Sequence, residues 1–223
     1  MSSRLTRSTL ATLAAVWFTF GYGGPAASST VWAQAPAAAT RFEIAPGSRV
    51  QYRVREQLVG VSFLSDAVGV NDSVKGSLIV RADGTIDPNA SRLMLDLTTF
   101  SSDQARRDNF IRRRVFEVEK FPEAVFVARR TEGSPLPNPN AKTPFPIVGF
   151  KLIGDMTMHG VTKEMSFDVI ATYNPEGQLV EGKAVTAFPF STFNLTKPEL
   201  PFLMSVQDEI RLEIDFKAKT SAN

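Results

Sequence analysis

The chain has 223 residues and a formal net charge of +2, with 43% apolar and 22% charged residues. This composition is ordinary for a folded protein and argues against a disordered, collagen-like or polytopic membrane chain. A charge of +2 is too small to indicate nucleic-acid binding. The absence of cysteine excludes disulfides, thiolate catalysis and cysteine-ligated metals, and His159, the one histidine, cannot alone build a site that needs two imidazoles.

Residues 1–33 have the pattern of a secretory signal peptide. Arg4 and Arg7 precede an apolar run over residues 10–20, which is too short to span a bilayer, and small and polar residues follow it. The pattern predicts a secreted or periplasmic protein without a stable membrane anchor. An uncleaved N-terminal anchor is the alternative.

Two cleavage points compete at the end of this segment. A cut after Ala35 matches the A-x-A rule but places Pro36 next, so a cut after Ala33 is preferred. We therefore expect one mature domain over residues 34–223. It would be formally neutral, because the two arginines of the signal account for the whole basic excess.

The first half of this domain contains three predicted strands. Residues 50–55 and 92–97 alternate between two sets of side chains with period two, which is typical of a strand with one dry and one wet face. A further strand is expected near 75–81. The Asp83-Gly84 pair after it predicts a turn.

The period changes after the third strand. A short helical segment is expected near 103–120, with Asp103 as the cap of a helix that ends at Arg114. Its apolar side would consist of Phe110, Ile111 and Val115.

The second half again predicts strands, at 124–130, 147–158, 164–173, 183–190 and 209–219. The last of these alternates strictly between apolar and charged residues over eleven positions. A turn is expected at 174–177, and the prolines of residues 133–146 predict an exposed loop. Many short antiparallel strands at this spacing predict an all-β barrel or sandwich.

The apolar face of such a barrel either fills the interior or encloses an apolar ligand. The chain has 17 phenylalanines, two of them in the expected signal peptide. For any single phenylalanine a place in a packed core is the more frequent outcome. Composition therefore leaves both interpretations open.

Catalytic patterns are nearly absent. His159 stands in a stretch that reads as a strand running into a tight turn, which favours a hydrogen-bonded structural histidine over a general base. Residues 177–183 match G-x-x-x-x-G-K, but Ala184 replaces the Ser or Thr that would hold magnesium, and a strand follows. No metal-ligand spacing is present. We expect no enzyme activity, no metal and no cofactor.

One basic cluster stands out, formed by Arg106, Arg107, Arg112, Arg113 and Arg114. It could receive anionic groups such as a phosphate head group or a membrane surface. The alternative is a solvated helix face neutralised locally by Asp108, Glu117, Glu119 and Glu123. The charge balance of the chain favours the alternative.

Four stretches together resemble the YceI-like family of secreted lipid-binding proteins. They are residues 76–78 with 95–102, residues 107–111 with 116–126, residues 154–163, and residues 190–194 with 206–210. Ile111 stands where the family usually has Leu, Ser191-Thr192 replace an Arg-Ser pair, and Asn194 replaces Gly. The loop at 133–146 resembles an insertion.

The resemblance implies a lipocalin-like antiparallel β-barrel of about eight strands that binds a long apolar chain, such as a polyisoprenoid, an isoprenoid quinone or a fatty-acyl amphiphile. The candidate lining residues are Val54, Leu95, Leu97, Phe110, Phe116, Phe121, Phe126, Met156, Phe167, Leu212 and Ile214. A lipid-processing enzyme that uses His159 and a ligand-free envelope interaction module remain alternatives. Whether the barrel forms a homodimer is left open.

Overall fold

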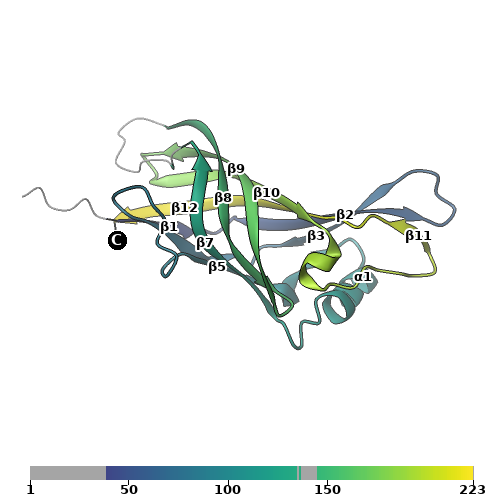
Figure 1. The fold of residues 1–223 in the computed structure, drawn as a ribbon. Coiled ribbons are helices and arrows are strands. Elements are labelled where there is room, and N and C mark those ends of the chain that lie inside the picture. Colours follow the sequence, from purple (N-terminus) through teal and green to yellow (C-terminus); the bar gives the residue numbers. More distant parts are fainter. Residues whose placement is uncertain (1–38, 135, 137–144, 223) are drawn as a thin grey trace, which may run out of the picture. The chain divides into compact units, whose positions relative to one another are not determined.

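The computed structural model describes residues 39–134, 136 and 145–222. The expected signal peptide, and most of the proline-rich loop, lie outside these residues. Within the described part, antiparallel strands close into an eight-stranded barrel (Figure 1). Around the ring they are β1 (Thr40–Ile44), β4 (Lys75–Val80), β5 (Arg92–Asp96), β7 (Glu123–Gly133), β8 (Phe145–Met158), β9 (Val161–Asn174), β10 (Leu179–Phe188) and β12 (Ile210–Ala222). The pairing of β1 with β12 closes the ring.

Four further strands extend the wall beyond the ring. They are β2 (Arg49–Leu58), β3 (Ser65–Asn71), β6 (Ser101–Ser102) and β11 (Leu203–Val206). β1 and β2 lie end to end along one edge of β12, with Ile44 opposite Ala218 and Arg49 opposite Asp215. Past the end of β12, β2 pairs with β11 on one edge and β3 on the other, which makes a three-stranded ribbon.

The break between β1 and β2 is held by Ser48. Gly47 adopts a φ of 91°, which glycine reaches without strain, and the chain bulges there. The buried Ser48 hydroxyl donates to the carbonyl oxygen of Ala45 at 2.9 Å and accepts from the backbone N–H of Lys217 at 2.9 Å. The side chain thus replaces ladder bonds that the bulge interrupts.

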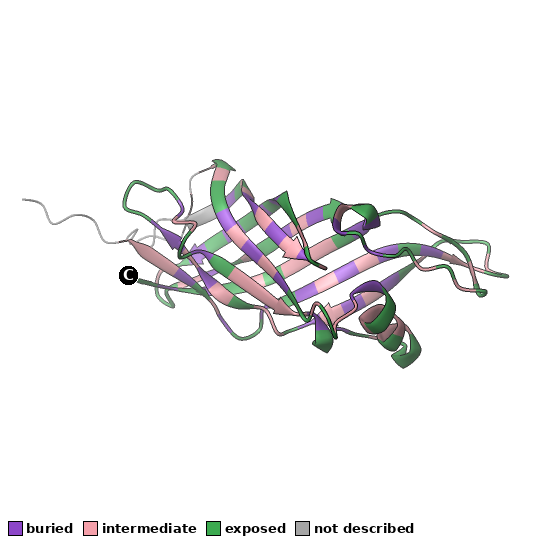
Figure 2. Ribbon diagram, turned by 60° about the horizontal axis from the view of Figure 1, so that its bottom comes forward, coloured by how far each residue is buried: buried purple, intermediate pink, exposed green. Residues whose placement is uncertain are grey.

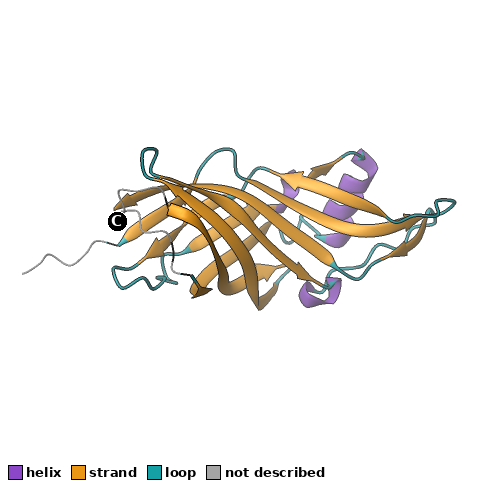
Figure 3. Ribbon diagram, turned by 90° about the horizontal axis from the view of Figure 1, so that it is seen from above, coloured by secondary structure: helices purple, strands orange, loops and turns teal. Residues whose placement is uncertain are grey.

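The helical elements cluster toward the ribbon end of the barrel (Figure 3). They are η1 (Leu97–Thr99), α1 (Ala105–Phe110), the π-helical turn η2 (Ile111–Val115) and η3 (Phe190–Phe193). The segment between β5 and β7 leaves the wall after Asp96 and rejoins it at Glu123, where the two strands pair. No described helix is long and apolar enough to cross a membrane.

Burial alternates along the strands, as period two requires (Figure 2). On β9 the buried side chains are Met165, Phe167, Val169, Ala171 and Tyr173, as the sequence predicts. The outward positions carry cross-strand ion pairs, for example Arg130 with Glu164 at 2.9 Å and Lys151 with Asp168 at 2.6 Å. Each of the eight predicted strands is present.

Several predicted details were wrong. Asp103 does not cap α1; the cap position is Gln104, which makes no side-chain capping bond, and the Asp103 carboxylate binds the Arg107 guanidinium instead. The α-helix ends at Phe110, not Arg114, because η2 continues with wider turns. Leu97 belongs to η1, not to a strand. β7 runs to Gly133 and β8 begins at Phe145, so the loop is shorter than predicted.

Candidate ligand-binding cavity

Residues in the described part of the chain line a narrow chamber inside the barrel and a wide chamber at its ribbon end. The narrow chamber has a volume of about 170 Å³ and the wide chamber about 550 Å³. The wide chamber falls in the usual range of small-molecule sites, which is roughly 300–1,000 Å³.

All side chains that line the narrow chamber are apolar. Most of them come from the ring strands, and Val50 of β2 and the loop residues Val74 and Leu136 join them. Phe126 and Phe167 meet there edge to face with ring centroids 5.2 Å apart. Several of these inward side chains are only half-buried: Leu78, Leu93, Leu95, Phe150, Leu152, Leu212, Ile214 and Phe216. Since they point into the barrel, the surface they leave uncovered faces the chamber. The side chains of the described residues therefore do not fill this interior.

The wide chamber lies between the ribbon and the helical segment. β2, β3 and β11 form one wall, α1 and η2 another, and residues 198–203 a third. Its lining is mostly apolar but includes Tyr52, Glu56, Asp103, Arg106 and Arg107. This chamber can therefore contact both an apolar chain and a polar group.

The two chambers follow one another along the same strands. On β2, Val50 lines the narrow chamber and Tyr52 the wide one; on β12, Leu212 lines the narrow chamber and Ile210 the wide one. Their linings run from Ala218 along β12 and on along β2, over roughly 40 Å of strand at about 3.3 Å per residue.

An aromatic cluster lies at the wall of the wide chamber, which Tyr52 and Phe116 line. Phe100 is buried between Tyr52 and Phe116, with ring centroids 5.3 Å and 5.7 Å away. Burial raises the pKa of the Tyr52 phenol well above its ordinary value near 10, although the nearby Arg107 charge opposes the shift. The phenol therefore stays neutral at physiological pH.

Arg107 joins the helical segment to the ribbon. Its guanidinium lies 3.2 Å from the carboxylate of Glu56, which is buried on β2, and also binds Asp103. The Glu56 and Arg107 side chains are 11% and 23% exposed, so water screens this pair less than an exposed one. Both groups line the wide chamber. They place a hydrogen-bond acceptor and a donor beside the same space.

His159 has a structural environment. His159 and Gly160 have φ angles of 50° and 74°, and they form the two-residue turn between β8 and β9. The imidazole packs edge-on against the Phe121 ring, with the ring centroids 4.7 Å apart, and Nδ1 lies 3.2 Å from the carbonyl oxygen of Phe193. Nε2 is buried without a hydrogen-bond partner among the described residues, 3.6 Å from Oε2 of Glu117. His159 lines neither chamber.

The residues predicted to line a cavity separate into three groups. Six line the narrow chamber: Leu95, Phe126, Met156, Phe167, Leu212 and Ile214. Three line the wide chamber: Val54, Phe110 and Phe116. Leu97 and Phe121 line neither, because Leu97 is fully buried in the core at 1% exposure and Phe121 packs on the β8–β9 turn. That any of them contacts a ligand stays a prediction.

The polar part of the wide chamber was not among the predicted site residues. Glu56 continues the inward series of Val50, Tyr52 and Val54 by one further period, so extending that alternation would have placed its carboxylate inside.

The arginines of the basic cluster differ in their contacts: two bind other parts of the fold and three form no ion pair with a described residue. Arg107 makes the ion pairs described above, and Arg112 donates to the carbonyl oxygen of Phe100 at 2.9 Å. Arg106, Arg113 and Arg114 form no ion pair with any residue in the described part of the chain. The expected neutralisation by Glu117 is not observed, because that carboxylate binds Lys120 at 3.0 Å, which lowers its pKa.

Among the described residues, no group of three acidic or histidine side chains could hold a metal ion.

A closed antiparallel barrel with an apolar interior defines a lipocalin-like class of fold. The chain belongs to the YceI-like domain family, whose sequence profile matches residues 43–218. A UPF0312 protein of Pseudomonas putida strain GB-1 is 39% identical over 94 residues, and one of strain W619 is 38% identical over 94 residues. Each alignment covers 41% of this chain and 42% of the relative, so the match spans about two fifths of the length of these relatives.

Solved structures show the same fold at low identity. A polyisoprenoid-binding domain from Saccharophagus degradans matches with a TM-score of 0.59 and 10% identity, covering 81% of this chain and 98% of that one. BcnA of Burkholderia cenocepacia matches with a TM-score of 0.55 and 15% identity, covering 77% and 96%. The YceI protein of Campylobacter jejuni matches with a TM-score of 0.50 and 16% identity, covering 70% and 85%.

One departure from the family pattern has a structural explanation. Asn194 follows η3 with a φ of 53°, in the left-handed region that glycine adopts freely. Asparagine is among the side chains that tolerate this region best, so it can stand in the place of Gly.

Proposed function

We propose that this protein is a secreted or periplasmic binding protein that encloses one long apolar chain inside the barrel. The ligand classes are a polyisoprenoid, an isoprenoid quinone or a fatty-acyl amphiphile. The observation that supports this most is the set of inward apolar side chains left half-buried around the narrow chamber. A solved neighbour of the same fold is a polyisoprenoid-binding domain, which supports the ligand class.

The two chambers suit the two parts of an amphiphile. The apolar tail would occupy the narrow chamber, and the head would lie in the wide chamber beside Glu56 and Arg107. Burial of each CH₂ contributes about 0.8 kcal/mol, so ten buried carbons contribute about 8 kcal/mol, the scale of a micromolar complex. Ordering of the ligand reduces that gain, which favours longer chains.

The remaining parts of the proposal concern processing and chemistry. Residues 1–33 would direct export and be removed after Ala33, leaving residues 34–223 as the mature protein. The protein would act by binding, without an enzymatic step, metal or cofactor, and without nucleic acid or a stable membrane anchor. A homodimer remains a candidate assembly.

The test fills the narrow chamber from within. Ala184 on β10 is buried and lines the chamber, whereas Ala187, on the same strand, is exposed outside. Ala184→Phe should reduce affinity for a fluorescent farnesyl or fatty-acyl probe at least about tenfold, and Ala187→Phe should leave it unchanged. Circular dichroism and thermal unfolding show whether each variant is folded. Equal affinity in two folded variants would refute binding in this chamber.

A further inference from the structure

Exposed apolar side chains gather at one end of the molecule described here. Seven large apolar residues are strongly exposed in the described ranges, and five of them lie on two neighbouring segments. We call these segments, residues 59–64 and 200–204, the distal tip; the second runs into β11. The five are Val59, Phe63, Leu64, Phe202 and Met204, with exposed fractions from 44% to 69%.

The distal tip is an ordered surface. The backbone N–H of Val59 donates to the carbonyl oxygen of Phe202 at 3.0 Å, which joins the two segments directly. Next to this bond, Leu203 of β11 pairs with Leu58 of β2. The ribbon therefore holds the five side chains outward at a fixed place. Their exposed surface adds nothing to the packed core, so a contact outside the fold would explain them.

This surface borders the wide chamber. Phe202 is exposed and also contributes to the chamber lining, together with Leu200 and Leu203. Any surface that covers the distal tip would therefore lie beside the chamber.

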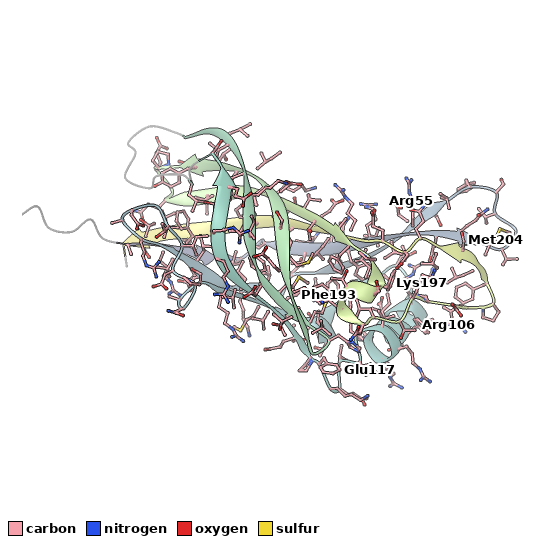
Figure 4. All side chains as sticks on the ribbon, viewed as in Figure 1. Arg55, Arg106, Glu117, Phe193, Lys197 and Met204 are labelled. Carbon is pink, nitrogen blue, oxygen red and sulfur yellow. The ribbon has the colours of Figure 1, made fainter. Side chains whose placement is uncertain are left out.

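Basic side chains lie on the barrel side of the distal tip. Of the side chains labelled in Figure 4, Met204 lies nearest the end of the ribbon, and Arg55, Arg106 and Lys197 are set back from it toward the barrel. Arg106 and Lys197 are exposed and form no ion pair with a described residue. Arg55 is partly neutralised by Asp66 at 3.5 Å, and Glu199 is also exposed.

We propose that the distal tip docks on a lipid bilayer that carries anionic head groups. Phe63, Leu64 and Met204 would enter the acyl boundary, while Arg106 and Lys197 would reach the phosphate layer. An apolar tip with cations behind it matches the order of acyl chains and phosphates in a leaflet. Because the positive excess is small, apolar insertion would supply most of the attraction. This docking concerns the outside of the protein and does not depend on what the barrel binds.

The experiment measures co-sedimentation of the purified protein with vesicles of phosphatidylcholine, with and without phosphatidylglycerol. The test variant is Phe63→Ser with Met204→Ser, neither of which lines a chamber. The matched control is Ile147→Ser with Ile170→Ser, the two exposed apolar residues of β8 and β9. We expect wild type and control to bind anionic vesicles equally, and the tip variant to bind at least about tenfold more weakly.

A charge variant separates the two components of docking. Lys197→Gln should weaken binding to anionic vesicles about fivefold and leave binding to pure phosphatidylcholine unchanged. Absence of wild-type binding to anionic vesicles would overturn the proposal, as would an equal loss in tip and control variants. It would also be overturned if the tip variant converted a dimer to a monomer without changing vesicle binding, because the surface would then join two copies of the chain. The lipid extracted from the tip variant reports on the proposed barrel ligand separately.

Discussion

The ring of Tyr52 lies directly on the backbone of Gly69, its partner across β2 and β3. A Cβ at Gly69 would lie 2.2 Å from Cε1 of Tyr52, a distance that real atoms do not adopt. Because Gly69 has no side chain, the phenol ring of Tyr52 fits against β3, next to Phe100.

Gly69→Ala should displace Tyr52 and lower the free energy of unfolding by about 1–3 kcal/mol, the usual cost of overpacking. Urea denaturation measures this. Gly149→Ala on β8 is the control, because a Cβ there would meet only the carbonyl oxygen of Val169 at 3.9 Å. In a Tyr52→Leu background the cost of Gly69→Ala should shrink. Equal effects at the two glycines would contradict the contact.

Stability should fall at alkaline pH because of Tyr52. Below about pH 10 the phenol is neutral in both the folded and unfolded states, so it causes no pH dependence. Above that pH the phenol ionises in the unfolded chain but not in the folded protein, where burial raises its pKa. Ionisation then lowers the free energy of the unfolded state, and the free energy of unfolding decreases. The urea concentration at the midpoint of unfolding should therefore decrease more between about pH 9 and pH 11 in wild type than in Tyr52→Phe. Parallel decreases would show that the phenol titrates normally.

His159→Asn tests whether this histidine is structural. Asparagine accepts the left-handed φ of the turn but loses the ring contact with Phe121 and the bond to the Phe193 carbonyl. The free energy of unfolding should fall by about 1–2 kcal/mol, with lipid affinity unchanged. Gln178→Asn, at a φ of 47° in another turn, is the matched control and should cost little. Loss of affinity, or loss of a measurable lipid conversion, at unchanged stability would instead favour the enzyme alternative.

Glu56→Gln tests the polar side of the wide chamber. It keeps the side-chain volume but removes the carboxylate that binds Arg107, so stability should fall by about 1–2 kcal/mol. Affinity for a probe with a polar head should change, whereas affinity for a hydrocarbon chain without a head should not, since the narrow chamber is untouched. Glu181→Gln, an exposed surface carboxylate on β10, serves as control. A uniform change in both affinities would argue against a head-group role.

The strands that the sequence predicted have mostly apolar inward faces, as on β9, where every second residue from Met165 to Tyr173 is buried and apolar except for the hydroxyl of Tyr173. β3 escaped prediction because its buried positions are Ala67, Gly69 and Asn71, so its apolar pattern is inverted. Gly69 is small to admit Tyr52, and Asn71 donates to the carbonyl oxygen of Asp96 at 2.7 Å. Neither reason is visible before the neighbouring strands are placed.

The same limit applies to the candidate site. The lining of the narrow chamber follows from period two, and six of its predicted residues lie there. The contact of Arg107 with Glu56 could not be predicted, because Glu56 is 51 residues away and meets Arg107 only after the helical segment folds against the ribbon. Arg107 also binds the local carboxylate of Asp103, but its buried partner Glu56 is set by tertiary packing.

Organic extraction of the purified protein, followed by mass spectrometry, tests apolar enclosure most directly. A lipid with a long apolar chain should be recovered at up to one molecule per protein, and its amount should fall in Ala184→Phe but not in Ala187→Phe. Recovery of no lipid, together with a crystal structure whose interior is filled by its own side chains, would contradict enclosure and favour a ligand-free interaction module.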